Sequence, residues 1–178
     1  MILFQKDELS VRELTEKDAI TLVKWLSDPT ILEYYEGRDR PHNLQQVHKH
    51  YYENRDNITQ CIIEYKGKEI GYVQFYPITA EEREKYGYKN YEEPIYGMDQ
   101  YIGEVDCWNK GIGTKLIKSS TEYLTSKGIN KIVMDPQAWN HRALRTYEKC
   151  GFIKKKFLPK HELHEGEMKD CWLMEYNK

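Results

Sequence analysis

Two spacings of apolar residues follow one another along the chain, and each predicts a different kind of element. Apolar residues at every second position, or in short unbroken runs, predict strands, whereas apolar residues three or four positions apart predict helices. Strands are predicted at 9–14, 61–65, 70–76, 95–102, 131–134, 152–157 and 171–176. Helices are predicted at 15–27, at 44 to about 52, at 115–127 and in the segment that follows Asn140. Strands and helices in this alternating order indicate an α/β protein.

Polar residues mark where the first two helices begin. Thr15 with Asp18 resembles a capping box with Asp in place of Glu, and Asn43 is a good cap for the second helix. Asp28-Pro29 is expected to end the first helix after Ser27. The residues expected on the buried face of this first helix are Ile20, Val23, Leu26 and part of Trp25.

Three connections between strands have different compositions. The turn Lys66-Gly67-Lys68 predicts a hairpin between the strands at 61–65 and 70–76. Residues 78–93 are charged and rich in Tyr, which predicts an exposed loop or a short helix. The last two strands are predicted to form an antiparallel pair joined by a long polar loop.

The segment Trp108–Thr114 carries two glycines between a predicted strand and a predicted helix. A strand, a glycine-containing turn and a helix N-terminus together present several backbone N–H groups to a phosphate. Gly111 and Gly113 lack a Cβ where a ligand would have to come close, and Lys110 adds positive charge. An ordinary glycine-rich connection explains the segment equally well when it is considered alone.

A second motif lies about thirty residues further on. Asn140 suits a helix N-cap, Ala143 and Tyr147 share a helix face, and Gly151 followed by Phe152 suits the C-terminal end. Together with the glycine segment, these residues resemble the GCN5-related N-acetyltransferases, which have an N-x-x-A-x-x-x-Y-x-x-x-G-F helix. All five positions of that pattern match. The glycine segment departs from the family at Trp108, where Gln or Arg is usual.

The resemblance covers nearly the whole chain and implies the fold. It implies an α/β domain over residues 1–178, with a mixed central sheet of about seven strands flanked by about four helices. It also implies acetyl-CoA as co-substrate, with the pyrophosphate at the glycine segment. The residues expected at the coenzyme are Tyr101, Ile102, Trp108, Lys110, Gly111, Ile112, Gly113, Thr114, Asn140, Ala143 and Tyr147.

Composition narrows the possible partners. The net charge of −2 argues against a general nucleic-acid binder. No apolar stretch is long enough to cross a membrane, and no secretory signal is present, so a cytoplasmic protein is expected. The four cysteines form no CxxC pair, which suits reduced thiols. A monomer and a homodimer both stay open.

Acidic and aromatic residues indicate the amine substrate. Asp99 lies in an otherwise uncharged strand, where a carboxylate is costly to bury without a partner. The acidic run at 162–170, taken alone, is better explained as solvated surface charge. Tyr96–Gly103, Asp135-Pro136 and His161–Gly166 resemble the aminoglycoside 6'-N-acetyltransferases, including the acetyltransferase half of bifunctional acetyl- and phosphotransferase resistance enzymes. A small polycationic substrate is therefore expected, bound by Trp25, Tyr35, Glu36, Asp99, Asp135, Glu167 and Asp170.

The same resemblance implies direct acetyl transfer with Asp99 and Tyr147 as the catalytic residues. Asp99 would accept hydrogen bonds from the substrate ammonium and orient its nitrogen. As a true base it is handicapped, because the reference pKa of Asp, about 3.9, lies far below that of an ammonium. Tyr147 would donate to the departing thiolate, and its alternative is a core aromatic on a helix face.

Other constellations and functions stay open at this stage. His161 and His164 are three residues apart, but no further ligand set accompanies them, so no metal site is expected and the histidines are expected to be exposed. Cys150 follows a helix and is expected to be buried. An acetyltransferase for a protein N-terminus, a polyamine or a siderophore amine would use the same coenzyme motifs. A non-enzymatic binding protein is disfavoured by the glycine segment, Tyr147 and Asp99 occurring together.

Overall fold

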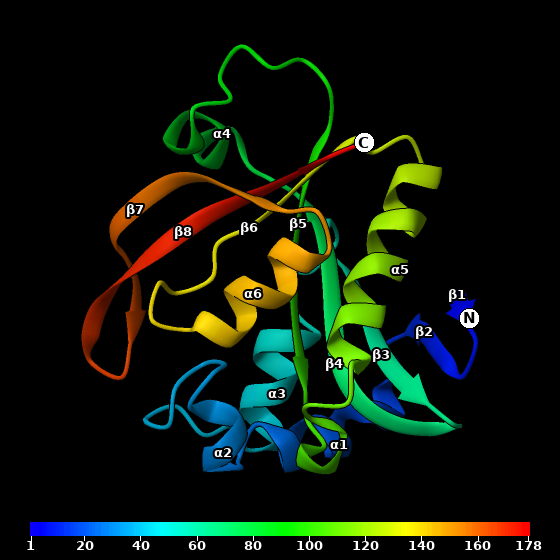
Figure 1. Ribbon diagram of the computed structural model, residues 1–178. Helices are drawn as coiled ribbons and strands as arrows, with labels where there is room; N and C mark the ends of the chain where they lie inside the picture. Colours follow the sequence, from blue (N-terminus) through cyan, green and yellow to red (C-terminus); the bar gives the residue numbers. More distant parts are fainter. The chain divides into compact units, whose positions relative to one another are not determined.

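The computed structural model covers residues 1–178 and contains eight strands and six α-helices (Figure 1). The strands form one mixed sheet in the order β1-β2-β3-β4-β5-β6-β8-β7, so the expected fold class is confirmed with one more strand and two more helices than expected. The chain divides into two compact units. Unit 1 comprises Met1–Gln74, Gln100–Ile112 and His164–Glu167, and unit 2 comprises Phe75–Asp99, Gly113–Leu163 and Met168–Lys178. A single domain over residues 1–178 stays a prediction.

Unit 1 contains the antiparallel strands at the amino-terminal end of the sheet. β1 (Ile2–Lys6), which the sequence pattern did not predict, pairs with β2 (Leu9–Glu13), and β2 pairs with β3 (Thr59–Tyr65). The turn between β3 and β4 (Lys68–Pro77) has Lys66 and Gly67 at positive φ, as a tight hairpin turn requires. The predicted hairpin is therefore confirmed.

The helices of unit 1 begin where the polar caps indicated. Thr15 and Asp18 form a capping box on a short 3-10 helix, which leads into α1 (Ala19–Trp25). Asn43 forms a second capping box at the start of α3 (Leu44–Tyr51). Between them, Asp28 does not merely end a helix, because its side chain accepts from Thr30 N and caps α2 (Pro29–Leu32).

The core of unit 1 is largely aromatic. The Tyr101 ring on β5 (Ile95–Ile102) lies 4.5 Å from the ring of Tyr35, 5.7 Å from that of Tyr72 and 6.0 Å from that of Trp25. Trp25 is only 1% exposed and packs as a core residue, so its expected contact with the substrate stays a prediction. The expected burial of Ile20 is also wrong: it is 75% exposed, since Ala19, Leu22 and Leu26 fill the buried face of α1.

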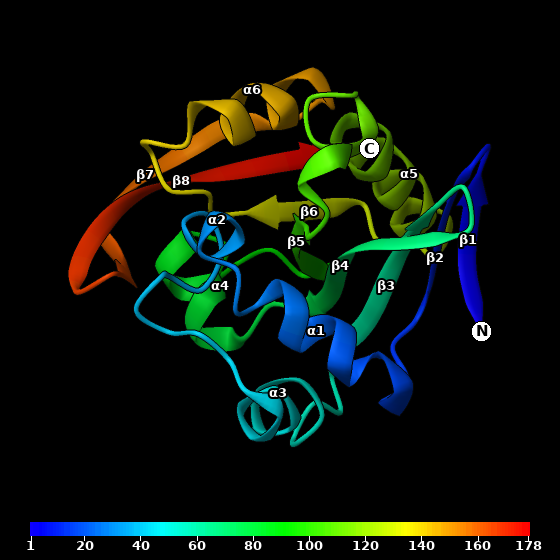
Figure 2. The ribbon, with the colours of Figure 1, turned by 90° about the horizontal axis from the view of Figure 1, so that it is seen from below.

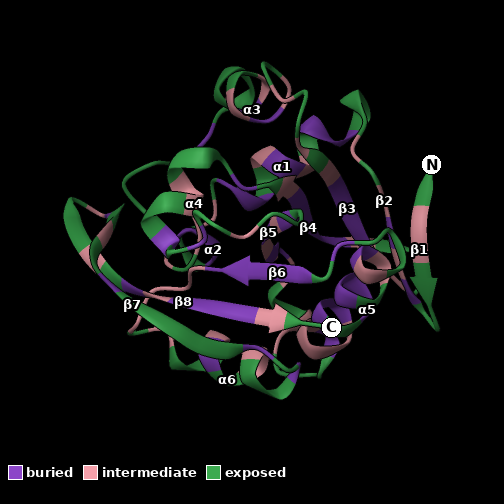
Figure 3. Ribbon diagram, turned by 90° about the horizontal axis from the view of Figure 1, so that it is seen from above, coloured by how far each residue is buried: buried purple, intermediate pink, exposed green.

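Unit 2 is built around β5, β6 (Lys131–Met134) and β8 (Glu167–Asn177). β6 pairs parallel with β5 and antiparallel with β8, and every residue of β6 is buried. Figures 2 and 3 show α5 (Ile112–Ser126) and α6 (His141–Lys149) on one face of β6 and β8, with α4 (Ala80–Tyr86) on the other. Side chains from β6, β8 and α4 share one apolar cluster, which includes Val133, Leu173 and Tyr86.

The long polar loop expected before the last strand is wrong. Residues 158–164 continue β7 (Ile153–His164), and β8 begins at Glu167, so only Glu165 and Gly166 separate the two strands. Both of these residues have positive φ, at 51° and 80°, as a type I′ hairpin turn requires. The strand predicted at 152–157 is the first half of β7, and its second half was taken for a loop because it is mostly exposed and carries polar residues at positions where an alternating strand would carry apolar ones.

The charged segment at 78–93 contains the short helix α4, one of the two predicted alternatives. Its tyrosines are less exposed than expected, because Tyr86 and Tyr88 pack into the apolar cluster of unit 2. No helix of the structure is long and apolar enough to cross a membrane.

Candidate active site

The glycine segment ends in the first turn of α5, three residues earlier than the sequence pattern predicted. α5 begins at Ile112, so Gly113 and Thr114 already belong to the helix. Asn109 and Gly111 have φ of +58° and +76°, a pair of left-handed residues that turns the chain into the helix. The first N–H groups of a helix have no intrahelical acceptor and favour a negative charge.

The backbone at this helix start is accessible to a ligand. A Cβ added at Gly111 or Gly113 would meet no atom within 4 Å, and Lys110 is exposed. These residues therefore fit a phosphate group. The Nε1 of Trp108 donates to Ile102 O at 2.8 Å and its ring packs edge-on against Tyr34, while its expected contact with the coenzyme stays a prediction. The indole thus fastens the turn to the end of β5.

α6 lies beside the start of α5 within unit 2. Asn140 Oδ1 accepts from Ala143 N at 3.3 Å, which confirms the predicted N-cap. At the other end of the helix Cys150 is buried, as expected, and its Sγ lies 3.6 Å from Thr114 O. Burial raises the pKa of this thiol, which disfavours a reactive thiolate. Tyr147 is half-buried, with its ring 6.3 Å from that of Phe152.

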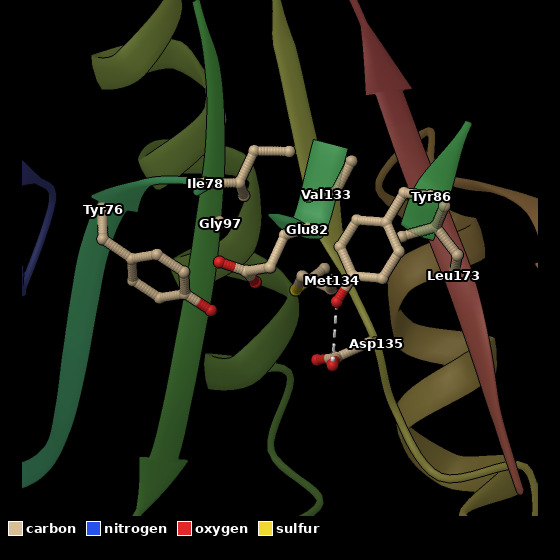
Figure 4. Close-up of a pocket in the computed structure, with 9 residues that line it drawn as sticks. All are labelled: Tyr76, Ile78, Glu82, Tyr86, Gly97, Val133, Met134, Asp135 and Leu173. Atoms are coloured by element: carbon tan, nitrogen blue, oxygen red, sulfur yellow. Dashed lines mark hydrogen bonds between the residues drawn. The ribbon is translucent and has the colours of Figure 1, made fainter. Parts of the chain in front are cut away.

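A small pocket, partly open to solvent, lies in unit 2 between α4 and the strands (Figure 4). The hydroxyl groups of Tyr76 and Tyr86 and the carboxylates of Glu82 and Asp135 lie among apolar side chains around this space. The residues that line it are Tyr76, Ile78, Glu82, Tyr86, Gly97, Val133, Met134, Asp135 and Leu173. Phenols and carboxylates around a small space suit a positively charged group.

Gly97 allows the Tyr76 ring to lie across β5 in this pocket. A Cβ at position 97 would come within 2.5–2.8 Å of the ring, so no side chain fits there. Tyr76 is hydrogen-bonded to Asp99, two residues further along β5. Burial, with the charges of Asp99 and Asp135, raises the pKa of Tyr76, so the phenol keeps its proton and donates to the carboxylate.

Asp135 ends β6 and is held by two donors. His161 Nε2 lies 2.8 Å from Asp135 Oδ2, and Tyr86 Oη lies 3.4 Å from the same oxygen. Burial first, and then the charge of Asp135, raise the pKa of Tyr86, which therefore also stays a donor. Asp135 is one-third exposed, so it faces the pocket rather than the core.

The other expected substrate residues have different surroundings. Asp170, in unit 2, is exposed, and its Oδ1 accepts from Lys160 N at 2.8 Å. In unit 1, Glu36 accepts from Tyr51 Oη at 3.2 Å and has a φ of +70°. Tyr35 packs against Tyr101, and Glu167 is exposed. Their roles at the substrate stay predictions.

Tyr101 and Ile102, which are expected to contact the coenzyme, are the last two residues of β5. The Tyr101 side chain is 8% exposed and faces the aromatic core of unit 1. Only its backbone is therefore available for a ligand beside the strand. Ile102 is half-buried, and its carbonyl accepts the Trp108 indole.

The expectation of exposed histidines is wrong for three of the six. His164 and His42 are buried, and the His161 side chain is 10% exposed. His42 Nε2 lies 2.8 Å from His50 Nδ1, and His42 Nδ1 lies 2.9 Å from Arg40 O, so this pair is internally bonded.

The pocket also contains residues that the sequence did not single out, namely Tyr76, Glu82, Tyr86 and His161. One signal was available, because a glycine inside a strand often marks the close approach of another group. Gly97 could have pointed to an aromatic neighbour in this way, although not to which one.

A model of the acetyltransferase (GNAT) domain matches residues 15–159. The chain belongs to the GNAT acetyltransferases. It is 31% identical over 150 residues to the aminoglycoside N(6')-acetyltransferase type 1 of Klebsiella pneumoniae, covering 82% of this chain and 74% of that protein. The same enzyme of Serratia marcescens matches equally. The chain is thus an acetyl-CoA-dependent N-acetyltransferase, as its coenzyme motifs indicated.

Solved structures agree with this family. The aminoglycoside acetyltransferase AAC(6')-Ib, in complex with ribostamycin and coenzyme A, has a TM-score of 0.78 at 26% identity and covers 97% of this chain and 94% of that one. The same enzyme with coenzyme A and kanamycin has a TM-score of 0.75, also at 26% identity, covering 96% and 95%. A spermidine N-acetyltransferase of Vibrio cholerae, at 19% identity and a TM-score of 0.74 (97% and 96% covered), shares the fold.

Proposed function

We propose that this acetyltransferase transfers the acetyl group of acetyl-CoA to the 6'-amine of an aminoglycoside and thereby confers resistance to the antibiotic. The observation that carries the proposal is the pocket of unit 2, in which Asp135 lines the space beside Tyr76, the partner of Asp99. The relatives named for aminoglycosides support it through their sequence identity.

The pocket supplies what an aminoglycoside needs. Its ammonium groups require fixed negative charges, and its hydroxyl groups require donors and acceptors that stay in place. Asp135 supplies a charge in the pocket, Asp99 supplies another beside it through its bond with Tyr76, and the phenols of Tyr76 and Tyr86 supply hydrogen-bonding groups. Asp99 is assigned to the reacting amine and Asp135 to a second amine of the same molecule.

The start of α5 is the proposed coenzyme site. Acetyl-CoA, when bound, supplies an acyl group activated by its thioester. The backbone N–H groups at Gly111, Ile112, Gly113 and Thr114 would hold its pyrophosphate, with Lys110 adding charge. Asn140 and Ala143 would flank the pantetheine arm as part of α6. Tyr101 and Ile102, at the end of β5, stay predicted coenzyme residues.

The chemical roles follow from the side chains. Asp99 accepts a hydrogen bond from the substrate amine and turns its lone pair toward the acyl carbon. Its partner Tyr76 keeps the carboxylate in one orientation. Tyr147 is proposed to donate its phenol proton to the sulfur as the thioester bond breaks, because a phenol is a sufficiently acidic donor for a thiolate. When the C–N bond forms, the proton that the nitrogen loses passes to Asp99 and on to water, and solvent returns a proton to Tyr147 after the thiol leaves.

The test is an acetylation assay with purified protein, acetyl-CoA and three kinds of amine. Kanamycin, spermidine and peptides with a free N-terminus are compared by thiol release, and the kanamycin product is analysed by NMR for its acetylated position. The proposal predicts acetylation of kanamycin at the 6'-nitrogen. Transfer only to spermidine or only to peptides would refute the substrate class and leave the family assignment intact.

Asp99→Asn is the matched variant for the catalytic claim, because it keeps shape and removes charge. It should lose most kanamycin acetylation. Glu122→Gln is its control, since Glu122 is an exposed carboxylate on α5 that does not line the pocket. Full activity of Asp99→Asn on kanamycin would remove Asp99 from the mechanism.

A further inference from the structure

His161 is a buried polar residue that the proposed mechanism does not use. It lies in β7, and its side chain is 10% exposed although its neighbours Lys160 and Glu162 are largely exposed. Its Nε2 lies 2.8 Å from Asp135 Oδ2. Its Nδ1 is buried and has no hydrogen-bond partner.

This geometry selects one form of the imidazole. The bond to Asp135 requires the hydrogen on Nε2, since a carboxylate only accepts. A hydrogen on Nδ1 would be a buried donor without an acceptor, which costs free energy. Leaving Nδ1 as an unpaired acceptor costs less. The geometry therefore places a hydrogen on Nε2, from which His161 donates to Asp135.

The two donors of Asp135 act on the same oxygen. Tyr86 Oη and His161 Nε2 both reach Oδ2, and no protein hydrogen bond reaches Oδ1. The hydrogen bond from Tyr86 Oη, at 3.4 Å, is weaker than the one from His161 Nε2, at 2.8 Å. Because one oxygen is fixed by the protein, the other is left for a cation in the pocket that Asp135 lines.

We infer that His161 is a positioning residue for the amine substrate, which acts by holding Asp135 through Nε2–H so that Oδ1 meets a substrate ammonium. The inference rests on the proposed function, in which Asp135 binds a second amine of an aminoglycoside. It adds a residue from β7, outside the coenzyme motifs, that sets the affinity for the amine without touching the reacting atoms.

Two variants of the protein distinguish the effect of the hydrogen bond from the effect of side-chain volume. His161→Leu fills the space without a donor, and His161→Gln places an amide N–H near the position of Nε2. The KM for kanamycin should rise about tenfold in His161→Leu, by loss of a hydrogen bond to a charged group, and stay within about twofold of wild type in His161→Gln. The kcat and the KM for acetyl-CoA should change little in both. His48→Leu, a half-exposed histidine on α3, is the control.

Two further measurements test the role of His161 without relying on catalysis. In calorimetry without acetyl-CoA, the affinity for kanamycin should be similar in the wild type and His161→Gln and lower in His161→Leu. In the wild type, nitrogen NMR of the imidazole should show a hydrogen on Nε2, and this measurement does not depend on whether His161→Leu folds. A ring that carries its hydrogen only on Nδ1 would overturn the inference.

Different results would refute the proposed function and the positioning role of His161. A wild type that neither binds nor acetylates kanamycin refutes the proposed function. A wild type that acetylates kanamycin while His161→Leu keeps its KM, or while His161→Gln is as impaired as His161→Leu, refutes the positioning role alone.

Discussion

Asp135→Asn is the most direct test of the substrate pocket, because it removes one charge and almost no volume. The donors from His161 and Tyr86 fix which end of the new side chain goes where. Asn would give its carbonyl oxygen to these donors and place its NH2 group where Oδ1 was. An ammonium would then meet two hydrogens instead of a carboxylate oxygen.

The size of the effect follows from the exposure of Asp135. Exposed ion pairs contribute about 0–1 kcal/mol and truncation of buried ones costs about 2–5 kcal/mol. Asp135 is one-third exposed, which places it between these cases, and we expect a loss of about 1–2 kcal/mol in substrate binding. That loss corresponds to an increase of about 5- to 30-fold in the KM for kanamycin.

The assay is steady-state acetylation of kanamycin at saturating acetyl-CoA, at low and at high salt. The wild-type KM should rise with salt, and the KM of Asp135→Asn should rise less steeply, because one screened attraction is gone. The kcat should change little, since Asp135 is assigned to a second amine and not to the reacting one. A variant that folds, keeps the wild-type KM and keeps its salt dependence would refute the assignment of Asp135 to the substrate.

Three further predictions test other parts of the structure. Gly113→Asp should raise the KM for acetyl-CoA at least tenfold by like-charge repulsion at the helix start, whereas Gly113→Ala, whose Cβ meets nothing within 4 Å, should stay near wild type; equal values for both variants would refute the phosphate site. Tyr147→Phe should lower kcat about 10–10³-fold with little change in either KM, and an unchanged kcat would make Tyr147 a packing residue. Glu175 is 3% exposed and accepts hydrogen bonds from Lys131, Asn177 and Tyr88. Burial raises the pKa of Glu175, but these bonds outweigh it, so the pKa is lowered in the folded protein. The stability that Glu175 contributes is therefore complete above its ordinary pKa near 4.5 and is lost as the pH falls through the lower folded value. Glu175→Gln should therefore unfold about 3 kcal/mol more easily at pH 7, where it leaves Lys131 buried without its carboxylate, and a thermal-melt difference from wild type that does not shrink toward pH 3 would contradict this account.

The elements with regular apolar spacing and clear caps could be predicted from the sequence. β5, β6 and α3 begin and end within about one residue of the prediction, and the Asn43 and Asn140 caps are present. These features depend on local chemistry, which the sequence contains. The start of α5 was placed too late because glycine has a low helix propensity, and this penalty is outweighed here by the rest of the helix.

The features that were missed depend on contacts between distant segments. The polar second half of β7, residues 158–164, gives no alternation, so this part of the strand is not visible locally. The bond from His161 to Asp135 joins residues 26 positions apart, and the one from Tyr88 to Glu175 joins residues 87 apart. The coenzyme motifs are contiguous in sequence and were found, whereas the pocket is assembled from four separate segments and could be found only in part.

The close packing of Tyr76 on Gly97 limits how this protein can change in evolution. Every substitution at position 97 adds at least a Cβ, so each one displaces the ring and with it the hydroxyl that holds Asp99. Conversely, a smaller residue at position 76 would remove the steric demand for glycine while leaving Asp99 without its donor. The two positions are therefore expected to vary together or not at all, and selection for a wider range of amine substrates would have to act on other walls of the pocket.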